Sequence, residues 1–142
     1  GFPQAVPMVA TLSLTFDELD HQTASMTLPD QSAYHNHVGG PHAGAMFTLA
    51  ESASGALVLA NFGDRLGDAT PLAVEATIRY LKLAMGPVTA TARMMRSGEE
   101  ILAELDRGGR PEFLVEIDLT SSDGTVTGQM TIVWTLKPNK RS

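Results

Sequence analysis

A run of small and apolar residues from Gly44 to Ala60 constrains the fold of this 142-residue chain more than any other feature. Histidine aside, its one charged residue, Glu51, is the only charged residue between Asp30 and Asp64. A helix that is hydrophobic on all sides is normally buried, because it has no face to present to water. The sequence therefore predicts a buried central helix that begins at Pro41, a favourable first helical residue, and runs to about Ala60.

Glu51 is out of place in such a helix. Helical spacing puts Phe47, Ser54, Gly55 and Val58 beside it, so no polar stripe accompanies the carboxylate. A buried, unpaired carboxylate costs several kcal/mol unless it is protonated. Two interpretations remain open: Glu51 reaches an arginine elsewhere or a protomer surface, or it is a catalytic carboxylate.

Most of the remaining chain has the alternating pattern of β-strands. The expected strands are Val9 to Phe16, His21 to Leu28, Ala73 to Leu83, Val88 to Arg96, Glu112 to Ser121 and Thr125 to Leu136, with Ser97 to Arg110 compatible with either a helical turn or a strand. Two strands, a buried helix and three or four further strands predict one α+β domain over residues 1–142. Its antiparallel sheet of five or six strands would wrap around the helix. So few strands cannot enclose the helix, so we expect a second subunit to cover the rest of it.

Composition excludes several classes of function. The net charge of −6 argues against nucleic-acid binding, which needs a basic face. The absence of cysteine rules out disulfides and thiolate metal sites and fits a cytoplasmic protein. No basic segment followed by an apolar core marks a signal peptide, and no uninterrupted apolar run is long enough to span a bilayer. We therefore expect a cytoplasmic protein that contacts neither nucleic acid nor membrane.

The loop before the central helix carries a motif, Asn36-His37-Val38-Gly39-Gly40-Pro41-His42-Ala43-Gly44, and Glu51 follows His42 by nine residues. This pattern resembles the hotdog-fold thioesterases, in the branch of the phenylacetyl-CoA and 4-hydroxybenzoyl-CoA thioesterases. That branch has an Asn, a glycine-containing loop, His-Gly-Gly at the start of the central helix, and Asp or Glu nine residues after the His. Ala43 replaces the central glycine here. Hydratases and dehydratases of the same fold use other spacings and fit less well.

The resemblance implies an acyl-CoA thioesterase acting on a small or medium acyl group, with coenzyme A as part of the substrate and no other cofactor. The Ala43 N–H would hold the thioester carbonyl oxygen at the positive end of the helix. Glu51 would act as general base or nucleophile, and Asn36 and His42 would orient the water or the thioester. Gly39, Gly40 and Gly44 would leave room for the acyl group or pantetheine. The family is dimeric or a dimer of dimers, with each site built from two chains.

Other candidate residues have both a functional and a structural interpretation. Phe47 lines the acyl pocket or belongs to the core, and Arg79, Lys82, Arg93 and Arg96 meet coenzyme A phosphates or are solvated strand positions. His35, His37 and His42 could form a metal cluster, but no acidic partner is evident nearby, so no metal site is expected.

Two further classes of function compete with the enzyme. The domain could hold an acyl-CoA or acyl-carrier thioester without hydrolysing it, or serve as an assembly domain with a vestigial pocket. Glu51 favours the enzyme, because a protein that only binds a thioester has no need of a buried carboxylate.

Overall fold

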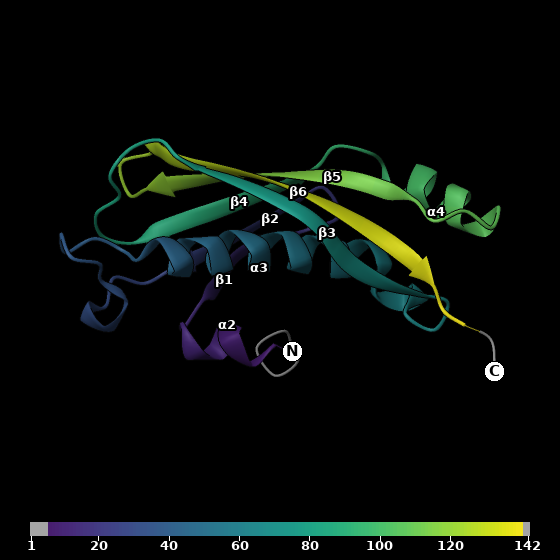
Figure 1. Cartoon of the computed structure of the whole chain (residues 1–142), viewed down its shortest axis with the longest axis horizontal. Coiled ribbons are helices and arrows are strands. Elements are labelled where there is room, and N and C mark those ends of the chain that lie inside the picture. The colour runs from purple at the N-terminus through teal and green to yellow at the C-terminus, as the bar shows by residue number, and fades with distance from the viewer. Residues whose placement is uncertain (1–5, 141–142) are drawn as a thin grey trace.

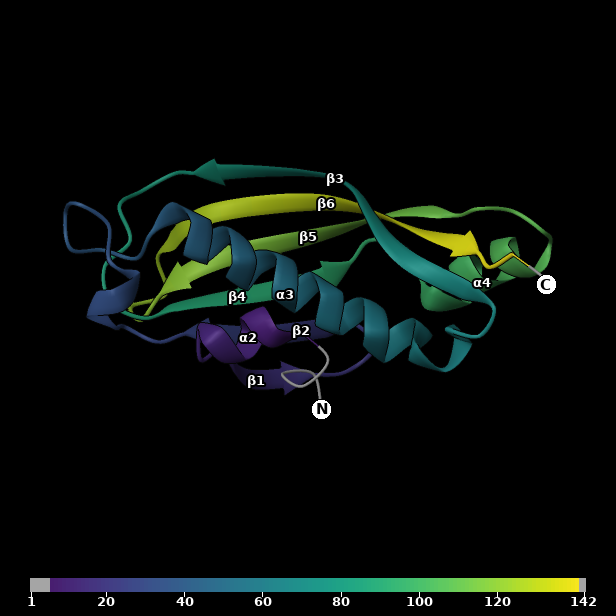
Figure 2. The ribbon, with the colours of Figure 1, turned by 60° about the horizontal axis from the view of Figure 1, so that its bottom comes forward.

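The computed structural model describes residues 6–140, in which one six-stranded sheet curls around a long helix (Figures 1 and 2). The main helix is α3 (Ala43–Phe62), with shorter helices α2 (Pro7–Thr11) and α4 (Gly98–Asp106) and two 3₁₀ turns, η1 (Ser32–Tyr34) and η2 (Gly63–Arg65). The strands are β1 (Thr15–Leu19), β2 (Thr23–Leu28), β3 (Ala69–Tyr80), β4 (Val88–Met94), β5 (Glu112–Ser121) and β6 (Val126–Pro138).

The sheet has the strand order β1-β2-β4-β5-β6-β3, and every neighbouring pair is antiparallel. The expected antiparallel sheet wrapped around one central helix is therefore confirmed. Strands β1 and β3 form its two edges. All five residues of β1 are exposed, and so are most of the twelve residues of β3.

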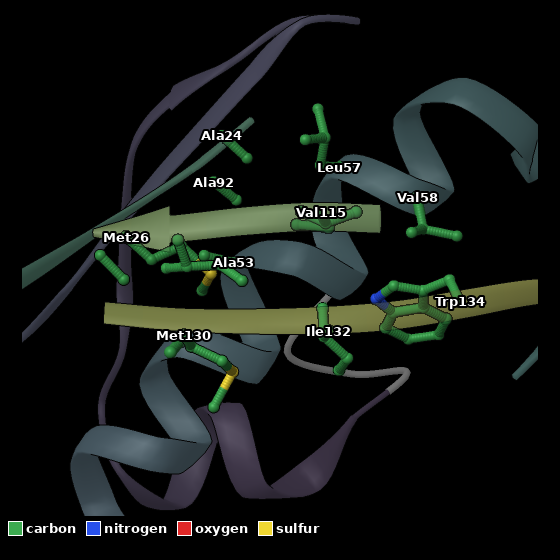
Figure 3. Packing of buried hydrophobic residues seen from close by; sticks show 14 of the residues in the cluster. Ala24, Met26, Ala53, Leu57, Val58, Ala92, Val115, Met130, Ile132 and Trp134 are labelled. Carbon is green, nitrogen blue, oxygen red and sulfur yellow. The ribbon is translucent and has the colours of Figure 1, made fainter. Parts of the chain in front are cut away.

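The core lies between α3 and the concave face of the sheet. Figure 3 shows side chains of four strands directed toward Ala53, Leu57 and Val58 of the helix; they are Ala24 and Met26 of β2, Ala92 of β4, Val115 of β5, and Met130, Ile132 and Trp134 of β6. Each is at most 7% exposed. Alanines on β2 and β4 let the helix approach closely, and close packing of this kind is typical of protein interiors.

Helix α3 is displaced by two residues from its expected span. It begins at Ala43, with His42 as N-cap, and ends at Phe62, which is almost fully buried. Pro41 is not the first helical residue; it lies before the cap and is itself buried. By length and apolar composition alone the segment Ala43–Arg65 would suffice to cross a bilayer, but in this fold it is the helix around which the sheet curls.

Other elements differ from expectation or settle an open alternative. The strand expected from Ala73 to Leu83 is β3, which begins earlier, at Ala69, and ends earlier, at Tyr80. The predicted strand from Val9 to Phe16 is helix α2 followed, after a turn at Ser13 with φ of +55°, by β1. Pro7 favours a helix start at this point. Val9 is fully buried, which the alternating pattern of a strand did not predict. The ambiguous segment after Ser97 is helix α4, because the Ser97 hydroxyl accepts a hydrogen bond from the Glu100 N–H and caps it.

A buried hydrogen-bond chain ties the middle of α3 to β6. The Trp134 indole N–H donates to Ser54 Oγ at 3.3 Å, and that hydroxyl donates to the Glu51 carbonyl at 2.7 Å. Because Ser54 is fully buried and Trp134 is 7% exposed, water cannot replace either bond. The turn of the helix that carries Glu51 is thereby fixed against the sheet.

Removing the Ser54 hydroxyl should therefore destabilise the fold. We expect Ser54→Ala to lower the free energy of unfolding in urea by about 1–3 kcal/mol, because the buried indole N–H of Trp134 loses its acceptor. Thr48→Ala is the matched control: its hydroxyl also donates to a carbonyl one turn earlier, at 3.1 Å, but has no second partner and is half-buried. Its effect should stay within about 0.5 kcal/mol. Equal losses in the two variants would contradict the importance of the Trp134 contact.

Candidate active site

The loop before α3 is organised by the side chain of Asn36. Its Oδ1 accepts hydrogen bonds from the N–H groups of Val38 and Gly40, at 3.0 and 3.1 Å. Its Nδ2 donates to the Pro41 carbonyl at 3.3 Å, and the Asn36 N–H donates to the Gly40 carbonyl at 2.7 Å. The amide oxygen is thus occupied inside the loop, so in this structure Asn36 shapes the loop. An additional role in orienting water or thioester stays a prediction.

The two glycines of this loop are required for different reasons. Gly39 has φ of +81°, a left-handed conformation that favours glycine. Gly40 packs against the chain beyond β3: a Cβ there would lie 2.4 Å from the Ala84 carbonyl oxygen and 3.1 Å from Met85 Sδ. The space at Gly40 is therefore filled by the protein itself, whereas Gly39 faces open space.

The first turn of α3 presents an unsatisfied backbone donor. The Gly44 N–H donates to His42 Nδ1 at 2.9 Å, whereas the Ala43 N–H has no acceptor among residues 6–140. The Tyr80 hydroxyl, from the end of β3, donates to the Ala43 carbonyl at 3.0 Å. A free N–H at the positive end of a twenty-residue helix can stabilise a developing oxyanion. This is the role that the resemblance to the thioesterases implies for Ala43.

Two hollows flank this helix start. One, of about 340 Å³, is lined by Asn36, Pro41, Ala43, Met46, Tyr80, Lys82 and neighbouring residues of the segment that follows β3. The other, of about 290 Å³, lies beneath α2 and is lined by Met8, Leu12, Ala33, Tyr34, His42, Gly44, Ala45 and Thr48. The structure thus groups Asn36, Ala43 and Lys82 around one hollow and His42 and Gly44 around the neighbouring one.

Tyr80 and the α2 residues were not found from the sequence. Tyr80 is separated from Ala43 by 37 positions, and no local pattern signals that their contact closes the helix start. Leu12 lies in the strand expected from Val9 to Phe16 and Met8 lies just before it, so no sequence pattern indicates that they approach α3. Both contributions depend on how distant segments are placed by the sheet.

Glu51 is half-buried and its carboxylate has no hydrogen bond or ion pair within the described part of the chain. Burial raises the pKa of this carboxyl above its ordinary value. The helix is not covered on all sides: a stripe that includes Phe47, Glu51, Gly55 and Leu59 is left open or only partly covered. An intrachain arginine partner, one of the structural interpretations of Glu51, is absent from residues 6–140.

The basic candidates are scattered. Lys82 lies beside the start of α3, whereas Arg79 is exposed on edge strand β3. Arg96 sits with Asn61 near the opposite end of α3, where it donates to the Glu112 carbonyl at 2.9 Å and Glu104 at 3.2 Å. Arg93 is paired with Asp118 at 3.2 Å. The structure does not bring the four cations together in one chain. Phe47 is 36% exposed on the open stripe of α3, and is therefore not a core residue of this chain.

The histidines of the loop do not converge. His35 Nε2 lies 2.7 Å from Asp30 Oδ1, so an acidic partner not expected from the sequence is present. His42 instead caps α3. Residues 6–140 contain no group of three or more side chains arranged to hold a metal ion.

Comparison with known proteins places the chain in a family. Residues 1–136 match the model of a domain of unknown function, DUF4442, and the chain belongs to that family. None of the curated proteins matches it. Among solved structures, it resembles a Pseudomonas aeruginosa protein of unknown function named "probable thioesterase", with 27% identity and a TM-score of 0.85 over 97% of this chain and 91% of that one.

Two other structures share the fold at lower identity. One is a variant of a P. aeruginosa thioesterase, with 21% identity and a TM-score of 0.78 over 96% of this chain and 89% of that one. The other is a variant of a Staphylococcus aureus thioesterase, with 19% identity and a TM-score of 0.75 over 94% and 100% of the two chains. The expected hotdog fold of thioesterases is confirmed, and these names agree with the expected class of enzyme; the narrower branch stays a prediction.

The raised pKa of Glu51 predicts how its replacement alters stability with pH. Below the ordinary glutamate pKa, Glu51 is protonated in both folded and unfolded chains and has no electrostatic penalty. As pH rises from the ordinary pKa to the raised pKa, Glu51 ionises in the unfolded chain before it ionises in the folded one. The free energy of unfolding therefore falls over this range of pH. We expect Glu51→Gln, which has no charge to bury, to match the unmodified protein in acid and to gain melting temperature over it toward neutral pH. A lower melting temperature for Glu51→Gln at neutral pH would instead indicate a stranded cationic partner.

Proposed function

We propose that this protein is an acyl-CoA thioesterase for small or medium acyl groups, with Glu51 as the reacting carboxylate. The observation that carries the proposal is a half-buried glutamate that has no partner in the described part of the chain. It lies on the helix whose first turn offers an N–H that is likewise free there. Ion pairing among residues 6–140 does not account for Glu51. A carboxyl with a raised pKa inside an apolar helix is a common feature of catalytic sites.

The proposed chemistry divides among few groups. The thioester carbonyl oxygen accepts the Ala43 N–H, which stabilises the negative charge that develops as the carbonyl carbon is attacked. Glu51 either removes a proton from the attacking water or attacks the carbonyl itself. A C–O bond forms, the C–S bond breaks, and the products are a carboxylic acid and the free thiol of coenzyme A. The hollow of about 290 Å³ beside His42 is at the small end of ligand sites, which favours a short acyl group.

One chain alone does not complete this site. Glu51 follows Ala43 by eight residues, which is about 12 Å along the helix axis. A general base must come within about 3 Å of the proton it removes. We therefore propose that the Glu51 of one protomer serves the helix start of another, as the family resemblance implies, in a homodimer or a dimer of dimers.

Edge strand β3 supports a specific dimer. Its outer backbone edge is unpaired, and Val74 and Tyr80 are 51% and 47% exposed. Such an edge readily pairs with another strand. Glu75 and Arg79 have no ion-pair partner in the described chain, and two antiparallel copies of β3 centred on Thr77 would place Glu75 opposite the second copy's Arg79, twice by symmetry.

A feature of the relatives is consistent with these roles. In the S. aureus thioesterase, a glutamine and a glutamate fifteen positions apart were each changed to alanine. Asn36 and Glu51 are separated by the same fifteen positions here. The proposal therefore keeps Asn36 in the site. It also includes a cytoplasmic location and no cofactor beyond coenzyme A.

The decisive test of function is turnover by Glu51→Gln. The amide keeps the size of the side chain but can neither accept a proton nor attack a carbonyl. We expect hydrolysis of short acyl-CoAs, followed by release of free thiol, to fall by about 10²-fold or more. Acyl-CoA binding should persist, since the oxyanion donor and the hollows are unchanged. An unmodified rate in the folded variant would remove Glu51 from the mechanism.

The same assay separates the enzyme from the competing class. A protein that binds an acyl-CoA or acyl-carrier thioester without hydrolysing it would release no thiol from any acyl-CoA in the panel. It would nonetheless retain binding in both the unmodified protein and Glu51→Gln.

Charge exchange on β3 tests the dimer. Glu75→Lys places like charges opposite each other at both symmetric pairs, and we expect it to weaken dimerisation by about 10-fold or more in analytical ultracentrifugation. The double variant Glu75→Lys with Arg79→Glu restores opposite charges and should recover the affinity. Glu18→Lys, on the other edge of the sheet, is the control and should change nothing. A 15.1 kDa monomer at micromolar concentration would rule out the shared site.

A further inference from the structure

The peptide group that joins Ala43 to Gly44, at the start of α3, makes one hydrogen bond through its carbonyl and another through its N–H. The carbonyl of Ala43 accepts a hydrogen bond from the Tyr80 hydroxyl at 3.0 Å, and the N–H of Gly44 donates to His42 Nδ1 at 2.9 Å. These two atoms belong to the same peptide unit, which joins Ala43 to Gly44. Tyr80, the peptide and His42 therefore form one continuous chain of hydrogen bonds.

The contact between Gly44 and His42 is closely fitted. A Cβ on residue 44 would lie 3.1 Å from His42 Nδ1 and 3.2 Å from His42 Cε1. These distances are tighter than ordinary carbon contacts, so a larger residue would push the imidazole away from the N–H. Glycine at this position is what allows the ring to cap its own helix.

Tyr80 is held in place by the sheet rather than by the helix. It pairs with Gly128 at the end of β3, and the next two N–H groups, of Leu81 and Lys82, both donate to the Thr127 carbonyl. Partial burial raises the pKa of the Tyr80 phenol, which keeps it protonated as a donor. The hydroxyl thus reaches α3 from a rigid position on a separate element.

We propose that Tyr80 is a positioning residue that acts through the Ala43–Gly44 peptide to hold His42 with its proton on Nε2. A hydrogen bond accepted by a carbonyl polarises its peptide and strengthens the hydrogen bond that the N–H of that peptide donates. A neutral imidazole has one donor and one acceptor nitrogen. Because Nδ1 accepts from Gly44, the proton lies on Nε2, and His42 presents a donor to the hollow that it lines.

This assignment divides the chemistry of the site between two residues, and in that respect it rests on the proposed thioesterase function. His42 offers an N–H toward an oxygen or sulfur atom of the thioester. Glu51 is left as the group that accepts a proton or attacks. Tyr80 itself need not touch the substrate, although it lines the neighbouring hollow with Ala43.

Nuclear magnetic resonance of the substrate-free protein tests the chain of hydrogen bonds directly. In the unmodified protein we expect ¹⁵N correlations that place the neutral His42 proton on Nε2, and a coupling across the hydrogen bond between the Gly44 nitrogen and His42 Nδ1. In Tyr80→Phe the coupling should weaken, and the Gly44 amide proton should shift upfield and exchange faster with solvent. Hydrolysis of acyl-CoA should fall about 3- to 10-fold, the effect of one neutral hydrogen bond.

Two further variants keep the result interpretable. Gly44→Ala should weaken the coupling, because its methyl group pushes the ring away by a few tenths of an ångström. Tyr34→Phe removes the other tyrosine hydroxyl, which donates to the Thr11 carbonyl at 3.2 Å, and should leave the Gly44 amide and the His42 tautomer unchanged.

Three results would overturn the proposal: a His42 proton on Nδ1 in the unmodified protein, a Gly44 amide unaffected by Tyr80→Phe, or an equal response to Tyr34→Phe. None of these measurements needs a substrate. A lack of thiol release from every acyl-CoA would therefore sink the proposed function, and full activity in Glu51→Gln would remove Glu51 from the mechanism. Either result leaves the His42 assignment to be decided by the spectra.

Discussion

The burial of one apolar helix against a curled sheet governs the rest of this structure. Helix α3 has small or apolar residues on the side that meets β2, β4, β5 and β6, and its Ala53 and Leu57 are fully buried. Hydrophobic burial of this kind is the main favourable term in folding. It also fixes the helix axis, so the groups at its first turn and at Glu51 are carried on a rigid element rather than on a loop.

The rigid helix gives the site its backbone donor, and side chains from other elements refine it. Asn36 shapes the preceding loop, and His42 accepts the hydrogen bond of the Gly44 N–H. From the end of β3, the Tyr80 hydroxyl donates to the Ala43 carbonyl. The Ala43 N–H, the first of the helix, is left without an acceptor in the described chain. Capping therefore does more than stabilise the helix: it leaves this donor, at a defined place, for a ligand.

The same architecture leaves two surfaces unfinished. Six strands do not enclose the helix, so the stripe around Glu51 is only partly covered, and β3 presents a long exposed edge. A half-buried ionisable group on the helix and an open outer edge on β3 are both costly for a monomer. Both surfaces become understandable if a second copy completes the sheet and brings its own helix start to Glu51, which is the basis of the proposed shared site.

The sequence by itself determined the central helix, the strand succession around it and the unusual position of Glu51, because hydrophobic periodicity and a lone charge are local signals. Strand β5 was predicted to the residue, since its alternation is strong and its turn to β6 is marked by Ser122-Asp123-Gly124. Tertiary structure alone decided that Gly40 packs on Ala84 and that Tyr80 meets Ala43. Those contacts join segments far apart in sequence, and their geometry exists only once the sheet has curled around α3.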